Sequence, residues 1–113
     1  MQMSQIQAMR DKPEWKKQQG DVIIRKVTAD VAGMGERKMG PGESLVPSTN
    51  PHMVAGARVF VDKESGAIFL TVARKGIFKH RQHGPITVGK GTYFVEPKVE
   101  IDAISDMQRP VQD

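Results

Sequence analysis

One segment of the chain reads clearly as two paired β-strands. Residues 57–62 and 67–74 are rich in β-branched and aromatic side chains, and a short polar turn at residues 63–66 separates them. Two such runs joined by a short glycine-containing loop are typical of an antiparallel hairpin. Alternation along the strands predicts one core-facing set, made up of Val59, Val61, Ile68, Leu70 and Val72. Phe60 and Phe69 fall on the opposite face, so we expect either cover on both faces or a partner on one of them.

The rest of the chain is divided into similar short runs by glycine, proline and turn residues. We expect strands at residues 21–27, 45–46, 77–83, 86–88 and 92–96, further pairing at 99–101, and a turn at residues 89–91. Short strands with frequent turns are typical of small barrels and sandwiches. We therefore predict a mainly β fold, a small barrel or sandwich of six to eight short antiparallel strands.

The first 19 residues are polar and are predicted to form an extended or partly helical N-terminal arm. Met3, Ile6 and Met9 recur at helical spacing, with Ser4 as a candidate N-cap, so a short helix is expected up to Asp11. An isolated helix of this length is marginal in water. The arm therefore needs a surface on which to dock.

Residues 20–113 are predicted to form a single β-rich domain. It includes a glycine-rich loop at residues 30–43, which lacks the spacing of a phosphate-binding loop, and a short C-terminal tail with weak helical spacing. A chain of 113 residues with 38% hydrophobic residues builds a thin core for a free-standing monomer. This points to stabilisation by a partner.

Composition excludes several classes of function. The chain has no cysteine, which removes disulfides, thiolate metal sites and cysteine nucleophiles. No apolar run approaches the roughly 20 residues that span a bilayer, so we expect a soluble protein made in a cytoplasm. The net charge of +4 is dispersed and lacks interleaved aromatic residues, which disfavours nucleic-acid binding. No catalytic motif is present, so we predict that the chain is not an enzyme and needs no cofactor.

The histidines are the only candidate metal-ligating side chains that cluster in the sequence. His80 and His83 form an H-x-x-H pattern, and His52 lies on a predicted turn; three convergent imidazoles are enough for a divalent metal. Residues three apart on an extended strand point to opposite faces, so convergence needs a turn or bulge near Gly84-Pro85. The neighbouring cations Lys79 and Arg81 disfavour a bound cation. The preferred interpretation is surface or hydrogen-bonding histidines, with a metal site as the alternative.

Residues 78–95 resemble a family of short β-rich proteins encoded by phages, prophages and actinobacteria. Members read approximately H-x-E-H-x-P-I-x-L-x-x-G-x-Y-x-V over this stretch. Upstream they open a strand with G-D-V, as residues 20–24 do here, and they carry a T-G-H-x-H turn, which corresponds to residues 49–53. In this chain the first histidine pair is reduced to His52, and Gln82 replaces the glutamate between the later histidines. The resemblance implies that the protein is encoded by a phage, and it does not indicate an activity.

These observations together predict a structural component of a phage virion, most simply a capsid decoration or cement protein that staples neighbouring capsid subunits. It would be made in the host cytoplasm and reside in the virion, with the major capsid protein or other virion subunits as partners and self-association left open. The candidate partner-binding residues are Met3, Ile6, Met9, Trp15, Arg37, Lys38, Phe60 and Phe69. The alternatives are a head–tail adaptor and a soluble small-barrel module that binds a divalent metal or nucleic acid.

Overall fold

The computed structural model describes the backbone of residues 1–48, 50–101 and 108–110, and the side chains of residues 1–48 and 50–98. The described elements are, in chain order, α1 (Met3–Asp11), β1 (Trp15–Gln19), β2 (Val22–Val27), β3 (Gly35–Arg37), β4 (His52–Val61), β5 (Ile68–His80), β6 (Ile86–Pro97), β7 (Val99–Ile101) and β8 (Gln108–Pro110). The predicted helical spacing in the tail falls largely on residues 102–107, which lie outside the described residues.

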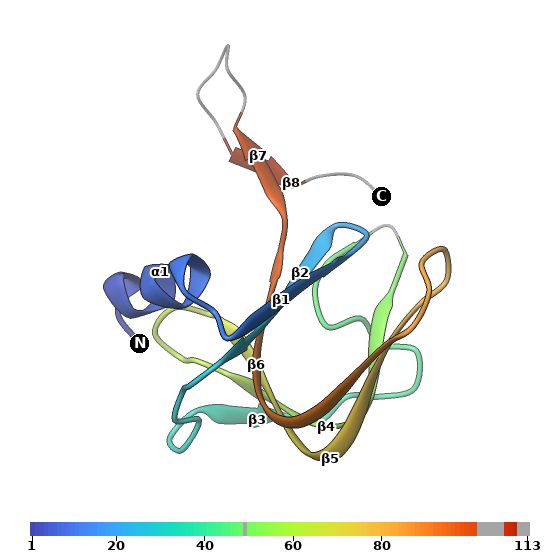
Figure 1. Cartoon of the computed structure of the whole chain (residues 1–113), viewed down its shortest axis with the longest axis horizontal. Coiled ribbons are helices and arrows are strands. Elements are labelled where there is room, and N and C mark those ends of the chain that lie inside the picture. Colours follow the sequence, from blue (N-terminus) through green and yellow to red (C-terminus); the bar gives the residue numbers. More distant parts are fainter. Residues whose placement is uncertain (49, 102–107, 111–113) are drawn as a thin grey trace.

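The fold is mainly β, as predicted. Six strands form one antiparallel sheet in the order β1-β2-β6-β5-β4-β3, and β7 pairs with β8 in a separate hairpin that projects from the curved sheet (Figure 1). The predicted hairpin at residues 57–74 is confirmed as the pairing of β4 with β5.

The three long strands β4, β5 and β6 bend sharply, which folds the sheet over itself (Figure 1). The β4–β5 register shifts between Ala55 and Ala57, around Gly56 with φ 77°. A Cβ atom on Gly56 would collide with the carbonyl oxygen of Lys75, so glycine is required at this close approach of the β4 and β5 backbones. In β6 the bend includes Gly89 and Gly91, both still paired with β5, so the predicted turn at residues 89–91 is instead a bend within one strand.

The principal core lies inside this bend. Its buried residues are Val22, Ile24, Leu45, Val46, Val59, Leu70, Val72, Phe78, Ile86, Val88, Tyr93 and Val95. Val59, Leu70 and Val72 lie there as the alternation predicted. Leu45 and Val46 do not form the short strand that we predicted; they belong to the loop between β3 and β4, which inserts both side chains into the core.

A second, smaller core lies on the outer face of the sheet, where helix α1 packs. Ile6 of the helix contacts a buried cluster with Phe69 and Phe94, whose rings stack 5.3 Å apart. Phe60, on the same face, is also buried and lies under the Arg58 guanidinium at 5.3 Å from the ring centroid. The second apolar face of the hairpin is therefore covered largely by this chain itself.

The segment predicted as an arm is part of the same folded body. The helix ends at Asp11, as expected, but residues 15–19 form the edge strand β1, paired in register with β2 from Trp15↔Lys26 to Gln19↔Val22. Its sequence lacks an apolar alternation because four of its five residues are exposed. The glycine-rich loop at 30–43 likewise contains a short edge strand, β3.

Candidate functional site

The three histidines converge at one end of the folded sheet. His52 begins β4 and lies directly opposite His80, the last residue of β5, with ring centroids 4.3 Å apart. His83 lies in the following loop, where its ring centroid is 4.8 Å from that of His80. The predicted obstacle, opposite faces on an extended strand, does not apply because β5 ends at His80 and the chain turns before His83.

Asp21 joins this cluster from the turn between β1 and β2. Its Oδ1 atom lies 2.6 Å from His52 Nε2, and both side chains are buried. Ser48 donates its hydroxyl hydrogen bond to the same carboxylate, at 3.0 and 2.9 Å from the two oxygens. In a catalytic triad the serine bonds to the histidine, not to the aspartate. This arrangement therefore fixes the histidine ring without activating the hydroxyl.

His80 shapes the backbone that follows it. Its Nδ1 atom accepts the backbone N–H groups of Gln82 and His83 at 3.1 and 3.2 Å, which shapes the loop after β5. A ring nitrogen that accepts two N–H groups carries no proton, so in the neutral ring the proton lies on Nε2, which then cannot ligate a cation. Among the described side chains, no group of three or more histidine or carboxylate residues is arranged to hold a metal ion. The geometry gives no support to the metal site that the sequence left as the alternative to hydrogen-bonding histidines.

Gln19 closes the same end of the fold. Its Nε2 atom donates to the carbonyl oxygens of Phe78 and Gly84, at 3.1 and 2.9 Å, and its side chain is buried. The β1–β2 hairpin is thereby tied to the end of β5 and to the loop that follows. Asp21, Ser48, His52 and His80 form one cluster of polar side chains at this end, which we call the polar joint. It brings together the three segments that carry the sequence resemblance, residues 20–24, 49–53 and 78–95.

A different surface surrounds Trp15, the only tryptophan of the chain. Trp15 is 36% exposed at the start of the edge strand, and its ring meets that of Tyr93 edge-on at 6.2 Å. Beside it lies a groove of about 330 Å³, lined by Glu14, Trp15, Lys26, Thr87, Val88, Gly89 and Tyr93. Its lining combines one acidic side chain, Glu14, and one basic side chain, Lys26, with aromatic and aliphatic surface.

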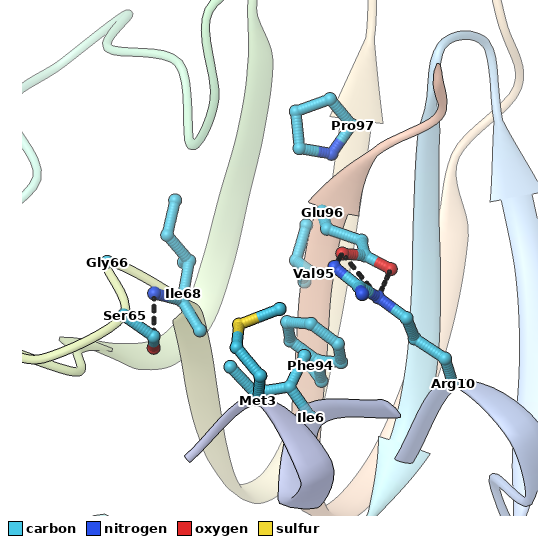
Figure 2. A pocket seen from close by; sticks show the side chains of 11 residues that line it. Met3, Ile6, Arg10, Ser65, Gly66, Ile68, Phe94, Val95, Glu96 and Pro97 are labelled. Atoms are coloured by element: carbon cyan, nitrogen blue, oxygen red, sulfur yellow. Dashed lines mark hydrogen bonds and ion pairs between the residues drawn. The ribbon is translucent and has the colours of Figure 1, made fainter. Parts of the chain in front are cut away.

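A second groove, of about 230 Å³, lies between α1 and the sheet. Figure 2 shows Met3 and Ile6 pointing from the helix toward Phe94, while Arg10 reaches Glu96. Arg10 binds both Glu96 oxygens, at 2.8 to 3.1 Å, and the hydrogen bond raises the pKa of Arg10 above its ordinary value.

Buried Arg25 shares the same carboxylate, with its Nη1 atom 2.6 Å from Oε1 of Glu96. Three elements, α1, β2 and β6, are therefore joined by one glutamate. The ion pairs of Glu96 close the groove and hold the helix against the sheet. Few of its polar groups are therefore left for a ligand.

The residues predicted to bind a partner separate into two groups. Ile6, Phe60 and Phe69 are buried within this chain, and Met9 is half-buried beside the outer core, because α1 and the sheet cover one another. Met3 is 63% exposed and Trp15 36% exposed. Arg37 donates to the carbonyl oxygens of Ser44 and Leu45 and so holds the loop that plugs the core, whereas Lys38 is exposed beside Glu36. Met3, Trp15 and Lys38 remain accessible.

Comparison with known protein families gives a match over most of the chain. A family model described as "Domain of unknown function (DUF8820)" matches residues 18–98, from β1 to the end of β6. No curated protein and no solved structure matches the chain. Within the described residues, no helix has the length and apolar character that a membrane-spanning segment needs.

Proposed function

The chain belongs to the DUF8820 family, whose description assigns no activity, and we propose that it is a structural component of a phage particle that decorates the capsid. One observation carries the proposal: Trp15, the largest side chain of the chain, remains 36% exposed on an edge strand beside a groove. Large aromatic residues that stay accessible beside a groove are typical anchors of protein–protein interfaces. The phage setting rests on the resemblance of residues 78–95 to phage-encoded proteins.

The polar joint supports a structural role and not a catalytic one. Asp21 holds His52, Ser48 bonds to the aspartate, and Nδ1 of His80 accepts backbone N–H groups, so each of these polar atoms stabilises the fold. A general base must instead be free to reach a substrate proton. We therefore propose that the histidine end acts as a rigid support, while the Trp15 surface makes the attachment.

The compact build also suits a protein that adds to a preformed shell. Helix α1 is clamped to the sheet by Ile6 and by the Arg10–Glu96 ion pair, so it is ordered before any partner is present. Pre-organised surfaces lose little conformational entropy on binding. The sequence predicted that the N-terminal arm would make the attachment. In our proposal, a surface of the folded domain makes it instead.

The test is whether the chain co-purifies with density-gradient-purified particles of the phage that encodes it, and in what copy number. We expect a simple ratio to the major capsid subunit. A copy number of about a dozen per particle would replace the decoration role with a head–tail adaptor, and complete absence from particles would overturn the virion proposal.

A further inference from the structure

We propose that the outer edge of β1 is a docking site for an extended acidic segment of the partner, which adds a strand to the sheet beside Trp15. The inference deepens the proposed function and rests on it for the setting, but the site is argued from this chain alone. In the described part of the chain, β1 is the first strand in the sheet order and pairs only with β2.

The free edge has the length and exposure that strand addition needs. β1 contains five residues, of which Trp15, Lys16, Lys17 and Gln18 are all exposed. An edge strand presents backbone N–H and C=O groups that a partner strand can pair with, and this pairing supplies affinity, while side-chain pockets supply specificity. Lysines on an edge also discourage aggregation. An edge serving only that purpose would not begin with a half-exposed tryptophan beside a groove.

The lysines on and around β1 favour an acidic partner segment. Lys16 and Lys17 lie on the strand itself, Lys26 lies opposite Trp15 in the register, and Lys12 precedes the strand. The nearby carboxylate of Glu14 accepts a hydrogen bond from the Thr28 hydroxyl. Opposite charges across paired strands stabilise the pair, and like charges destabilise it. A second copy of β1 would set lysines near lysines, so an acidic strand is favoured over self-pairing.

The groove adds a requirement for an apolar residue. It lies beside the start of β1, on the side of Trp15 that faces β2 and β6, where Lys26, Val88 and Tyr93 line it next to the accessible Trp15 ring, so only a partner residue that passes over Trp15 reaches it. A volume of about 330 Å³ accepts one or two side chains. The preferred segment therefore carries an aliphatic or aromatic residue flanked by glutamate or aspartate.

The test uses the full chain, labelled with ¹⁵N, and a capped synthetic peptide of alternating glutamate with valine and leucine. We expect saturable NMR shift changes centred on residues 15–19 and slower exchange of β1 amides. The same peptide with alternate residues N-methylated keeps its charge but cannot pair along its backbone, so binding should weaken at least tenfold. No saturable change up to about 1 mM peptide would overturn the proposal, as would equal binding of the N-methylated peptide.

A matched pair of variants separates local from general electrostatics. The Lys16→Glu/Lys17→Glu variant should bind the acidic peptide at least tenfold more weakly than the wild type. The Lys63→Glu/Lys79→Glu variant makes the same change in net charge at two exposed lysines outside β1 and should bind within about twofold of the wild type. Equal losses in both variants would overturn the edge assignment.

The edge inference and the virion proposal fail in different ways. Peptide binding by a chain that is absent from purified particles would overturn only the virion proposal. A chain that is present in particles but does not respond to the peptide would overturn only the edge inference.

Discussion

At the residue scale, Asp21 carries the polar joint that closes one end of the sheet. Replacing it with alanine removes the partner of His52 Nε2 and of the Ser48 hydroxyl in a buried site. We expect Asp21→Ala to lower the free energy of unfolding by about 3 kcal/mol, since the loss of hydrogen bonds to a buried carboxyl group is costly. Urea unfolding followed by Trp15 fluorescence measures this loss.

The control for this prediction is Asp11→Ala. Asp11 is an exposed aspartate whose side chain accepts only from Gln7 among the described contacts, so its removal should change stability by no more than about 0.5 kcal/mol. Similar losses in the two variants would contradict the view that Asp21 is a structural joint.

Asp62 makes the stability of the fold depend on pH in the acid range. Its carboxylate accepts the Ser65 hydroxyl, the terminal ammonium of Met1 and the Ser65 backbone N–H, in that order of influence, and these contacts lower its pKa to about 2. A lowered pKa stabilises the fold above the unfolded pKa of about 4, and the contribution is lost as pH falls toward 2. We therefore expect Tm to fall between pH 4 and pH 2 by a larger amount in the wild type than in Asp62→Asn.

Ser65→Ala provides the companion measurement. Removing the hydroxyl takes away the largest cause of the shift and should move the pKa of Asp62 back toward its ordinary range, which reduces the acid sensitivity between pH 4 and pH 2. A pH profile that is unchanged in both variants would assign acid sensitivity to other carboxylates.

At the element scale, the bend in β4 depends on Gly56. Gly56 and Gly66 share φ 77°, but a Cβ atom on Gly56 would collide with the Lys75 carbonyl oxygen, whereas nothing lies within 4 Å of one on Gly66. Gly66→Ala should therefore show only the cost of positive φ, about 1 kcal/mol. Gly56→Ala should destabilise by at least about 2 kcal/mol more, because the strands must separate. Calorimetry that found equal losses would contradict this account of the bend.

Helix α1 depends on one buried anchor. Ile6→Ala should lower the free energy of unfolding by about 2–4 kcal/mol and expose Phe69 and Phe94, because the helix has no other fully buried residue. Cleavage by trypsin after Arg10 should then become faster. Met3→Ala is the control, since Met3 is 63% exposed and its truncation should leave the cleavage rate close to wild type. Equal protection of the two variants would show that Ile6 does not hold the helix.

Local patterns predicted the elements whose signals are local. Alternation in the β4–β5 hairpin identified both the strands and their faces, and the spacing of Met3, Ile6 and Met9 identified α1. The strand β1 was missed because an exposed edge strand shows no apolar alternation. The break expected at residues 89–91 became a bend because Gly89 and Gly91 both stay paired with β5, on either side of a shift in register between Val72 and Lys75.

At the scale of the whole molecule, the chain covers a large part of both faces of its own sheet. The inner core fills the bend, and α1 covers the outer cluster around Phe69 and Phe94. The meeting of Asp21, His52 and His80 could not be read from their spacing, because it depends on the β4–β5 register and on closure by the β1–β2 turn. The H-x-x-H pattern was visible, but only the end of β5 determines that the rings meet.

The edge near Trp15 remains uncovered, and our account assigns attachment to it. The most direct measurement is saturation binding of the purified chain to phage particles that lack it, comparing wild type with Trp15→Ala and Met3→Ala. We predict saturation at a simple ratio to the capsid subunit, at least tenfold weaker binding for Trp15→Ala, and near-wild-type binding for Met3→Ala. Equal binding by wild type and Trp15→Ala would contradict the claim that this edge is the attachment surface.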